Sequence, residues 1–457
     1  MTPRASSLRE PGAVLLVSCY ELGHAPHGIA LPAAFLRRAG FSPAALDLAV
    51  EPIDPQRVER ARLIAVSVPM HTALRVALDN LPRLRQLAPG AVIGFIGSYA
   101  LLHAPMLRAL GAGFALGGEL EDALVDIARA VERGEHLPDA IVPLQRLRFP
   151  APDRTGLART DAYAHLIAAG GERRTAGYTE ASRGCLDTCR HCPVPAVYGG
   201  RFFVVDRETV LADVEAQVAA GARHITFGDP DFLNGPRHAL AITRELHRRF
   251  PAVTFDVTAQ VSHLLRDRGH LAELVALGCA FVTTAVESLS DRVLAALAKR
   301  HRRADVERLL DLAAEAGLVL RPTFVPFTPW TELADLVDLV ELIAARDLVD
   351  CVAPVQLSIR LLVPPGSLLL ADGGADRFGP YDPAALGHIW RHADPRVDDV
   401  QRAIALLVEQ DTRAARDPVE TFNAIRAIAR EAVRLPTAYA LPRPVRRVPR
   451  LSEPWFC

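Results

Sequence analysis

The stretch that most constrains this chain is residues 183–192, where three cysteines stand at the spacing C-x3-C-x2-C: Cys185, Cys189 and Cys192. Three closely spaced thiolates can hold three irons of a four-iron, four-sulfur cluster, whereas a closed electron-transfer cluster takes four cysteines. The fourth iron is then free to bind a substrate or a cofactor. The alternatives are a structural zinc site made of the three cysteines and His191, or three unrelated thiols. Structural zinc sites usually pair two separated halves, and the sequence has no second half nearby.

The composition bounds the class of protein. With 457 residues and a formal net charge of −1, the chain is long enough for two or three domains and gives no reason to expect nucleic acid. No apolar run approaches the ~20 residues of a membrane helix, and the N-terminus does not resemble a signal peptide. Three of the seven cysteines cluster, which indicates a reduced compartment and a metal site. We therefore expect a cytoplasmic protein without membrane contact.

Residues 1–135 are expected to form an α/β domain, because apolar strand-like runs alternate with helical spacing. This alternation predicts a parallel sheet covered by helices on both sides. Ligands of such sheets bind at the carboxyl ends of the strands, near the switch in strand order. The expected strands are residues 13–20, 45–50, 63–68, 92–97 and 114–116, and the expected ligand loops are residues 21–28, 67–72, 97–99 and 117–119.

A Pro- and Arg-rich linker is expected at residues 136–174, followed by a second series of strand–helix units at residues 175–370. Residues 371–435 are expected to be helical, with Asp417 as the N-cap of the last helix. Residues 436–457 hold several prolines and arginines and are expected to be an irregular basic tail. The expected strands of the second series are residues 177–181, 224–227, 255–257, 281–286, 319–325 and 352–357; the expected helices of the last region are residues 383–388, 397–408 and 419–433.

The cysteine spacing, with His191 before the last cysteine, resembles that of the radical S-adenosylmethionine (SAM) enzymes. The resemblance implies a partial (β/α)6 barrel with its chemistry at the carboxyl ends of the strands. It also implies that the open iron chelates SAM and that the reduced cluster cleaves SAM to methionine and a 5′-deoxyadenosyl radical. The substrate is unidentified, a small molecule or a peptide. A reductase or a flavodoxin- or ferredoxin-type donor would supply the electron.

The same resemblance implies SAM contacts at the ends of two strands. Gly228 and Asp229 match the family's small-plus-acidic motif for the SAM ammonium group, and Asp231 is a second candidate. A turn with its usual glycine, aspartate and proline would explain the same residues. Glu287 and Ser288 resemble the family's V-E-S segment, which contacts the ribose. Residues 324–331 lack the glycines of the family's adenine-binding pattern, so the resemblance assigns no adenine contact there.

The N-terminal layout resembles the cobalamin-binding domain that precedes the radical domain in one branch of these enzymes. Ser67, Gly97 and the run Gly117-Gly118-Glu119 are loose matches. The family's D-x-H-x-x-G signature is absent, because the histidines at 24 and 27 do not have its spacing. Cobalamin could still bind without a protein ligand to cobalt.

The whole chain is also similar to the CUAEP/CCAEP-tail radical SAM proteins, which end in Cys followed by selenocysteine or cysteine and then Ala-Glu-Pro. Here the sequence stops at Cys457, where the second of these residues would begin. One hypothesis is a selenocysteine codon read as a stop; the other is a natural end with a surface cysteine. Two rival functions remain: a non-catalytic iron–sulfur electron carrier or sensor, and a zinc-stabilised α/β binding protein.

Overall fold

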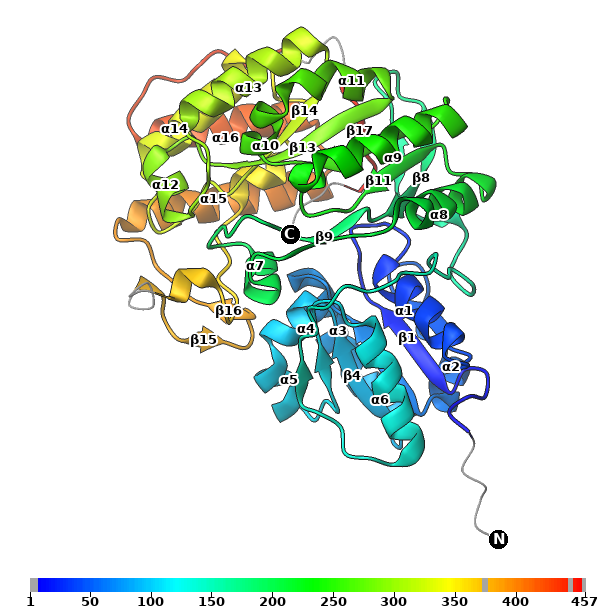
Figure 1. Cartoon of the computed structure of the whole chain (residues 1–457). Coiled ribbons are helices and arrows are strands. Elements are labelled where there is room, and N and C mark those ends of the chain that lie inside the picture. The colour runs from blue at the N-terminus through cyan, green and yellow to red at the C-terminus, as the bar shows by residue number, and fades with distance from the viewer. Residues whose placement is uncertain (1–6, 372–376, 443–446, 454–457) are drawn as a thin grey trace.

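The computed structural model describes residues 7–371, 377–442 and 447–453. Two sheets organise the chain (Figure 1). The N-terminal sheet lies below a larger curled sheet, which we call the barrel sheet, and helix α7 (Pro193–Tyr198) lies between them. Among the described residues, no helix combines the length and the apolar character needed to cross a bilayer.

The N-terminal sheet is parallel, with the strand order β2-β1-β3-β4-β5-β6. Every residue of β1 and β3 is buried, as expected for strands covered on both faces. Apolar residues of α1 and α6 form the core on one face, and those of α2 and α3 form the core on the other. The elements are β1 (Val14–Ser18), α1 (His27–Arg38), β2 (Ala44–Asp47), α2 (Pro55–Arg60), β3 (Leu63–Ser67), α3 (His71–Leu87), β4 (Val92–Ile96), α4 (Ser98–Leu102), α5 (Ala104–Ala109), β5 (Ala115–Leu116), α6 (Glu121–Arg133) and β6 (Ala140–Ile141).

The barrel sheet has the order β14-β13-β12-β11-β8-β7-β17, in which β8 to β14 run parallel. Strand β7 pairs antiparallel with β8, and β17 pairs antiparallel with β7. The expected partial barrel is therefore present. Its strands are β7 (His165–Ile167), β8 (Arg173–Thr179), β11 (His224–Phe227), β12 (Thr254–Thr258), β13 (Cys279–Glu287), β14 (Leu320–Phe324) and β17 (Arg450–Leu451); its helices are α8 (Arg207–Ala219), α9 (Pro236–Arg249), α10 (Val261–Arg266), α11 (Leu271–Ala276), α12 (Asp291–Ala296), α13 (Arg303–Ala316) and α14 (Leu333–Ala345).

The prediction of a sixth barrel strand at residues 352–357 is wrong. This segment forms the 3-10 helix η4 (Pro354–Ser358). Pro354 has no N–H to donate to a strand ladder and instead occupies the first turn of the helix. In the described part of the chain, the sixth position retains a single parallel bridge between Phe327 and Arg360.

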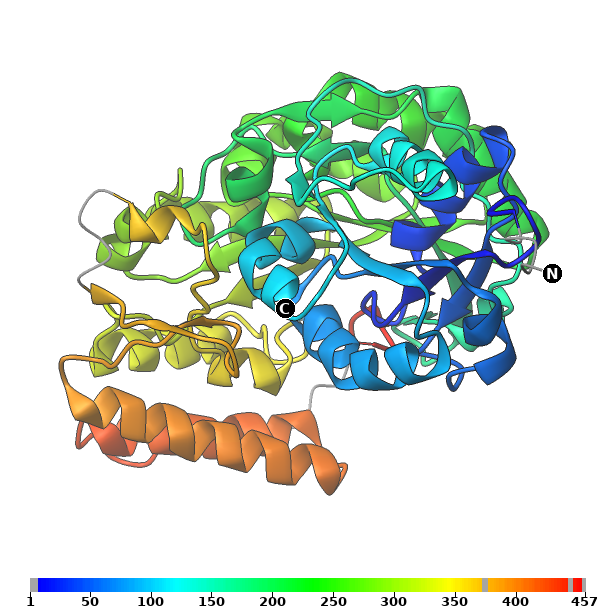
Figure 2. The ribbon, with the colours of Figure 1, turned by 90° about the horizontal axis from the view of Figure 1, so that it is seen from below.

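The C-terminal region differs from its prediction in two places. The helix expected at residues 383–388 is wrong: β15 (Tyr381–Asp382) and β16 (Gly387–His388) form a hairpin, and the φ of Leu386 is +52°, which a right-handed helix excludes. The tail also contributes strand β17, although no regular element was expected there. Helices α15 (Pro395–Arg413) and α16 (Pro418–Ala432) lie side by side along one edge of the barrel (Figure 2), and Asp417 caps α16 by accepting from Val419 N at 2.9 Å.

The predicted linker is not structureless, because it supplies β6 to the N-terminal sheet and β7 to the barrel sheet. The two sheets are also joined by buried contacts. Arg183, on the short strand β9 (Ser182–Gly184), pairs with Glu121 of the N-terminal domain at 2.7 Å. Leu102 of α4 packs against Val197 and Tyr198 of α7. Residues 185–192, which we call the cysteine loop, connect β9 to α7 and therefore lie next to this junction.

Candidate active site

The cysteine loop brings three thiols together beside the carboxyl ends of β11 and β12. Cys185 and Cys189 are both buried, and both contact the amide of Gln260, at 3.8 Å and 3.9 Å from their Sγ atoms. None of the three forms a disulfide. Burial raises the pKa of Cys189 to about 11 and that of Cys192 to about 12. These buried thiols need compensating positive charge to ionise, which is what a metal site supplies.

The remaining described cysteines lie elsewhere. Cys19 follows β1 in the N-terminal domain, Cys279 begins β13 at the end of that strand opposite Glu287, and Cys351 precedes η4. All three are buried. Cys457 lies outside the described residues. The described part of the chain thus presents a three-cysteine ligand set.

The end of β11 positions the residues predicted to contact the SAM ammonium group. Asp229 accepts from Ala181 N at 3.0 Å and from the hydroxyl of Ser182, which ties β11 to the entry of the cysteine loop. Burial raises the pKa of Asp229 to about 7. Gly228 is required by packing, because a Cβ there would lie 1.7 Å from the Tyr178 hydroxyl. Asp229 is therefore an anchored carboxyl group whose oxygens can accept further hydrogen bonds.

Asp231, the second candidate, is fully buried and is also anchored. Its carboxylate accepts from Leu233 N at 2.9 Å, from Gln260 N at 3.2 Å and from His263 Nδ1 at 2.7 Å. It joins the end of β11 to the loop after β12.

The end of β13 brings together two residues that were predicted separately. His191 Nε2 lies 3.2 Å from Glu287 Oε1, and Lys299 Nζ lies 3.4 Å from the same oxygen. Burial alone would raise the pKa of Glu287, but Lys299 and His191 lower it to about 2. Glu287 has a φ of +66°, a left-handed conformation that a residue with a side chain rarely adopts. Ser288 is buried beside it, and its Oγ accepts from Ser290 N at 3.1 Å.

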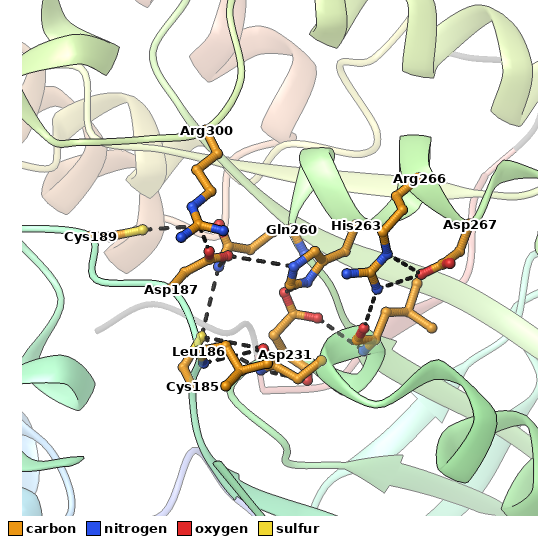
Figure 3. A network of polar contacts seen from close by, with 12 residues as sticks. Cys185, Leu186, Asp187, Cys189, Asp231, Gln260, His263, Arg266, Asp267 and Arg300 are labelled. Carbon is orange, nitrogen blue, oxygen red and sulfur yellow. Dashed lines mark hydrogen bonds and ion pairs between the residues drawn. The ribbon is translucent and has the colours of Figure 1, made fainter. Parts of the chain in front are cut away.

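A buried polar network links the cysteine loop to β11 and β12 (Figure 3). Asp187 accepts from Gln260 Nε2 at 2.7 Å and pairs with Arg300 Nε at 2.9 Å. His263 bridges Asp231 and Asp187, with its Nε2 3.6 Å from Asp187 Oδ2. Oxygen and nitrogen atoms of Asp187, Asp231 and His263 lie within 4.8 Å of one another, close enough to share a metal ion. The guanidinium of Arg300 already pairs with the carboxylate of Asp187 in this group. Asn234, Gln260 and His263 were missed as site residues, since no spacing rule connects them to the cysteines.

The carboxyl edge of the N-terminal sheet presents a second group of buried polar side chains. The switch in strand order falls between β1 and β3, where Glu21 accepts from Gly28 N at 3.1 Å and from Ser67 Oγ at 3.3 Å. Burial raises the pKa of Glu21 to about 8. His24 and His27 are buried against Tyr178 of β8, with ring centroids 4.9 and 5.9 Å away. Both loop histidines thus pack against the barrel.

Among the described residues, the buried atoms at this edge that have no hydrogen-bond partner include Nδ1 of His24, Nδ1 of His27, Oε2 of Glu119 and Oε2 of Glu121. Burial lowers the pKa of His24 to about 4 and also lowers that of His27, so both imidazoles are neutral at physiological pH. Unpartnered buried polar groups are costly, which makes this edge suited to a polar ligand. A cavity of about 740 Å³ between linker residues 152–161 and the end of α8 has none of the predicted site residues on its wall.

Comparisons with known proteins agree with this geometry. Residues 179–340 match the model of the radical SAM superfamily. TsrM from Kitasatospora setae, a radical SAM methyltransferase solved with cobalamin and a [4Fe-4S] cluster bound, is 19% identical, with a TM-score of 0.60 over 74% of this chain and 73% of that chain. OxsB, a cobalamin-dependent radical SAM enzyme solved with aqua-cobalamin and SAM bound, is 14% identical, with a TM-score of 0.67 over 88% of this chain and 67% of that chain. None of the curated proteins matches the chain.

The likeness to TsrM and OxsB confirms the predicted fold class, an N-terminal Rossmann-like sheet joined to a partial barrel. The narrower similarity to the CUAEP/CCAEP-tail proteins is not confirmed, and its tail lies in residues outside the described part of the chain.

Proposed function

We propose that this radical SAM enzyme, whose radical SAM domain spans residues 179–340, cleaves SAM reductively at a [4Fe-4S] cluster held by Cys185, Cys189 and Cys192. One observation carries the proposal: three thiols, those of Cys185 and Cys189 buried and that of Cys192 partly buried, share one loop at the carboxyl end of a partial barrel. Three thiolates leave one iron without a protein ligand. When bound, the cluster supplies one electron that breaks a carbon–sulfur bond of SAM and yields methionine and a 5′-deoxyadenosyl radical.

The residues present fit such a cluster. The raised pKa values of Cys189 and Cys192 mean that these thiols ionise only with nearby positive charge. Lys299 provides part of it, since its ammonium group acts on both thiols and opposes the effect of burial. Iron would provide the rest.

We assign the SAM contacts to the two strand ends. Glu287 is ionised at any physiological pH, and its carboxylate is proposed to accept from the ribose hydroxyls, with Ser288 beside it and His191 holding the carboxylate in place. The backbone at Gly228 and the spare lone pairs of Asp229 and Asp231 are proposed to take the SAM ammonium group. The anchoring of both aspartates by backbone N–H groups would fix their geometry before SAM arrives.

We also propose that cobalamin binds at the carboxyl edge of the N-terminal sheet. A corrin ring carries peripheral amides, whose N–H groups and carbonyls match the unpartnered atoms of the buried histidines and glutamates there. When bound, cobalamin would supply a cobalt centre for transfer of a methyl group to a small molecule or a peptide. His24 and His27 both pack on Tyr178, and neither is proposed as a cobalt ligand.

The electron carrier is the weaker alternative, because a closed cluster needs a fourth cysteine and the other described ones lie apart from the loop. A cytoplasmic reductase, flavodoxin or ferredoxin would reduce the cluster.

The test is anaerobic reconstitution with iron and sulfide, followed by dithionite and SAM, with 5′-deoxyadenosine measured by mass spectrometry. We expect product from the wild type and none from Cys189→Ala. A reduced cluster that leaves SAM intact would favour the electron carrier, and a colourless zinc protein would refute both.

A further inference from the structure

We propose that the side-chain amides of Asn234 and Gln260 donate hydrogen bonds to the cluster-ligating sulfur of Cys185 and thereby raise the reduction potential of the cluster. Asp187 is a positioning residue that holds Gln260 in the donating orientation. The proposal rests on the proposed function, because it assumes that Cys185 binds the cluster. It concerns the reduction potential of the cluster, which the cysteine ligands alone do not determine.

The orientation of Asn234 is set by its neighbours. Its Nδ2 lies 3.5 Å from Cys185 Sγ, whereas its Oδ1 lies 3.9 Å from the same sulfur and accepts from Leu186 N at 3.2 Å. Nδ2 also donates to the carbonyl of Asp231 at 3.2 Å. Reversing the amide would set its NH2 group against one donor and its oxygen against one acceptor. Nδ2 therefore faces the sulfur.

The orientation of Gln260 is set by Asp187. An ionised carboxylate only accepts hydrogen bonds, so the 2.7 Å contact to Asp187 Oδ2 must come from Nε2 of Gln260. The same nitrogen lies 3.8 Å from Cys185 Sγ. The backbone N–H of Gln260 donates to Asp231, which fixes the residue from the other side.

Asp187 is itself held firmly. Arg300 Nε lies 2.9 Å from its Oδ1, and the side chain of Asp187 is 1% exposed. Figure 3 shows Asp187 of the cysteine loop, Asp231 of the loop after β11 and Gln260 of the loop after β12 converging, with Arg300 beside Asp187. Asp187 also acts on Cys185 and Cys189 through its negative charge, which the ion pair with Arg300 offsets only in part because the Arg300 side chain is 63% exposed. Its role in the proposal is to position Gln260.

Hydrogen bonds to the sulfurs are one determinant of the potential of an iron–sulfur cluster. A donor to a cysteine sulfur stabilises the more negatively charged state, and the reduced cluster carries one more negative charge than the oxidised one. Two neutral donors at Cys185 therefore favour the reduced state. An electron-transfer protein with a less negative reduction potential could then reduce the cluster.

The experiment is a potentiometric EPR titration of reconstituted protein, in the absence of SAM, for Asn234→Leu and Gln260→Met. Both substitutions keep the approximate volume and remove the donor. Gln217→Leu is the matched control, since Gln217 is a buried amide of the same barrel that bonds to Tyr178 and Asp213 and touches no cysteine. We expect more negative potentials for both variants at an unchanged iron content, and no shift for the control.

Unchanged potentials at full iron content, or an equal shift in Gln217→Leu, would overturn the proposal. Where Asn234→Leu assembles no cluster, Asn234→Asp replaces it, because its carboxylate still accepts from Leu186 N while the donor is lost. Its potential must also fall below that of the wild type. A wild-type protein that assembles no cluster would refute the proposed function itself, and the proposal with it.

Discussion

Replacing Lys299 with methionine should destabilise the protein even before any cofactor is bound. The Lys299 side chain is 2% exposed, and its Nζ lies 3.4 Å from Glu287 Oε1. Lowering the pKa of Glu287 from 4.5 to about 2 against the effect of burial corresponds to roughly 3 kcal/mol of favourable interaction. His191 supplies part of that energy. We therefore expect Lys299→Met to cost about 2 kcal/mol, below the roughly 3–5 kcal/mol that breaking a buried ion pair costs, because His191 still contacts Glu287.

The assay is thermal unfolding of the anaerobic apo-protein, followed by circular dichroism. For a large domain, about 2 kcal/mol corresponds to a fall in Tm of roughly 4–8 °C. Glu287→Gln and the double variant complete a cycle, and the two single effects should not add because the side chains act as a pair. An unchanged Tm for Lys299→Met, or strictly additive effects, would show that Lys299 and Glu287 do not stabilise the fold as a pair.

The stability difference between the wild type and Lys299→Met should depend on pH. In the wild type, the lowered pKa of Glu287 contributes stability that is present above pH 4.5 and lost as the pH falls toward 2. In Lys299→Met, burial favours the neutral carboxyl group. The Tm difference between the wild type and the variant should therefore be largest at neutral pH and should narrow in acid.

Three further predictions follow from single residues. Cys189→Ser should reduce the iron content after reconstitution, measured by colorimetric iron analysis, without lowering the Tm of the apo-protein; full iron loading would contradict the ligand assignment. Gly228→Ala should lower the Tm, because its Cβ would lie 1.7 Å from the Tyr178 hydroxyl, whereas Gly269→Ala has open space and should not. Burial raises the pKa of Glu21 to about 8, so between pH 5 and pH 8 Glu21 is ionised in the unfolded chain but still largely protonated in the folded protein. The wild type therefore loses stability as the pH rises through this range, whereas Glu21→Gln does not. The variant should gain stability relative to the wild type from pH 5 to pH 8. Thermal scans at both pH values test this, and a constant difference would contradict it.

The cysteine loop could be predicted because its chemistry is local in sequence. Three cysteines within eight residues indicate a metal site without knowledge of the fold. The candidate residues at the strand ends could be predicted for a similar reason. Asp229 and Glu287 follow buried apolar runs whose carboxyl ends meet at one edge of a parallel sheet.

The partners of those residues could not be predicted in this way. The pairing of His191 with Glu287 joins positions 96 residues apart, and Gln260 lies 73 residues from Asp187. Only the folding of the barrel sheet brings such residues together. Buried amides such as Asn234 carry no sequence signature, because asparagine is also common in turns.

The errors in secondary structure have a related cause. The mostly apolar segment at 352–357 is compatible with both a buried strand and a short helix, and periodicity alone does not separate them. Strand β17 pairs with β7, which lies more than 280 residues earlier in the chain, so no local pattern around Arg450 indicates a strand.

The most direct test of an open cluster in this protein is Mössbauer spectroscopy of the reconstituted protein before and after SAM is added. We expect a four-iron cluster in which one iron in four differs from the rest and alone changes its isomer shift when SAM binds. Four irons that stay equivalent and do not respond to SAM would contradict this expectation, because a fourth protein ligand would then close the site.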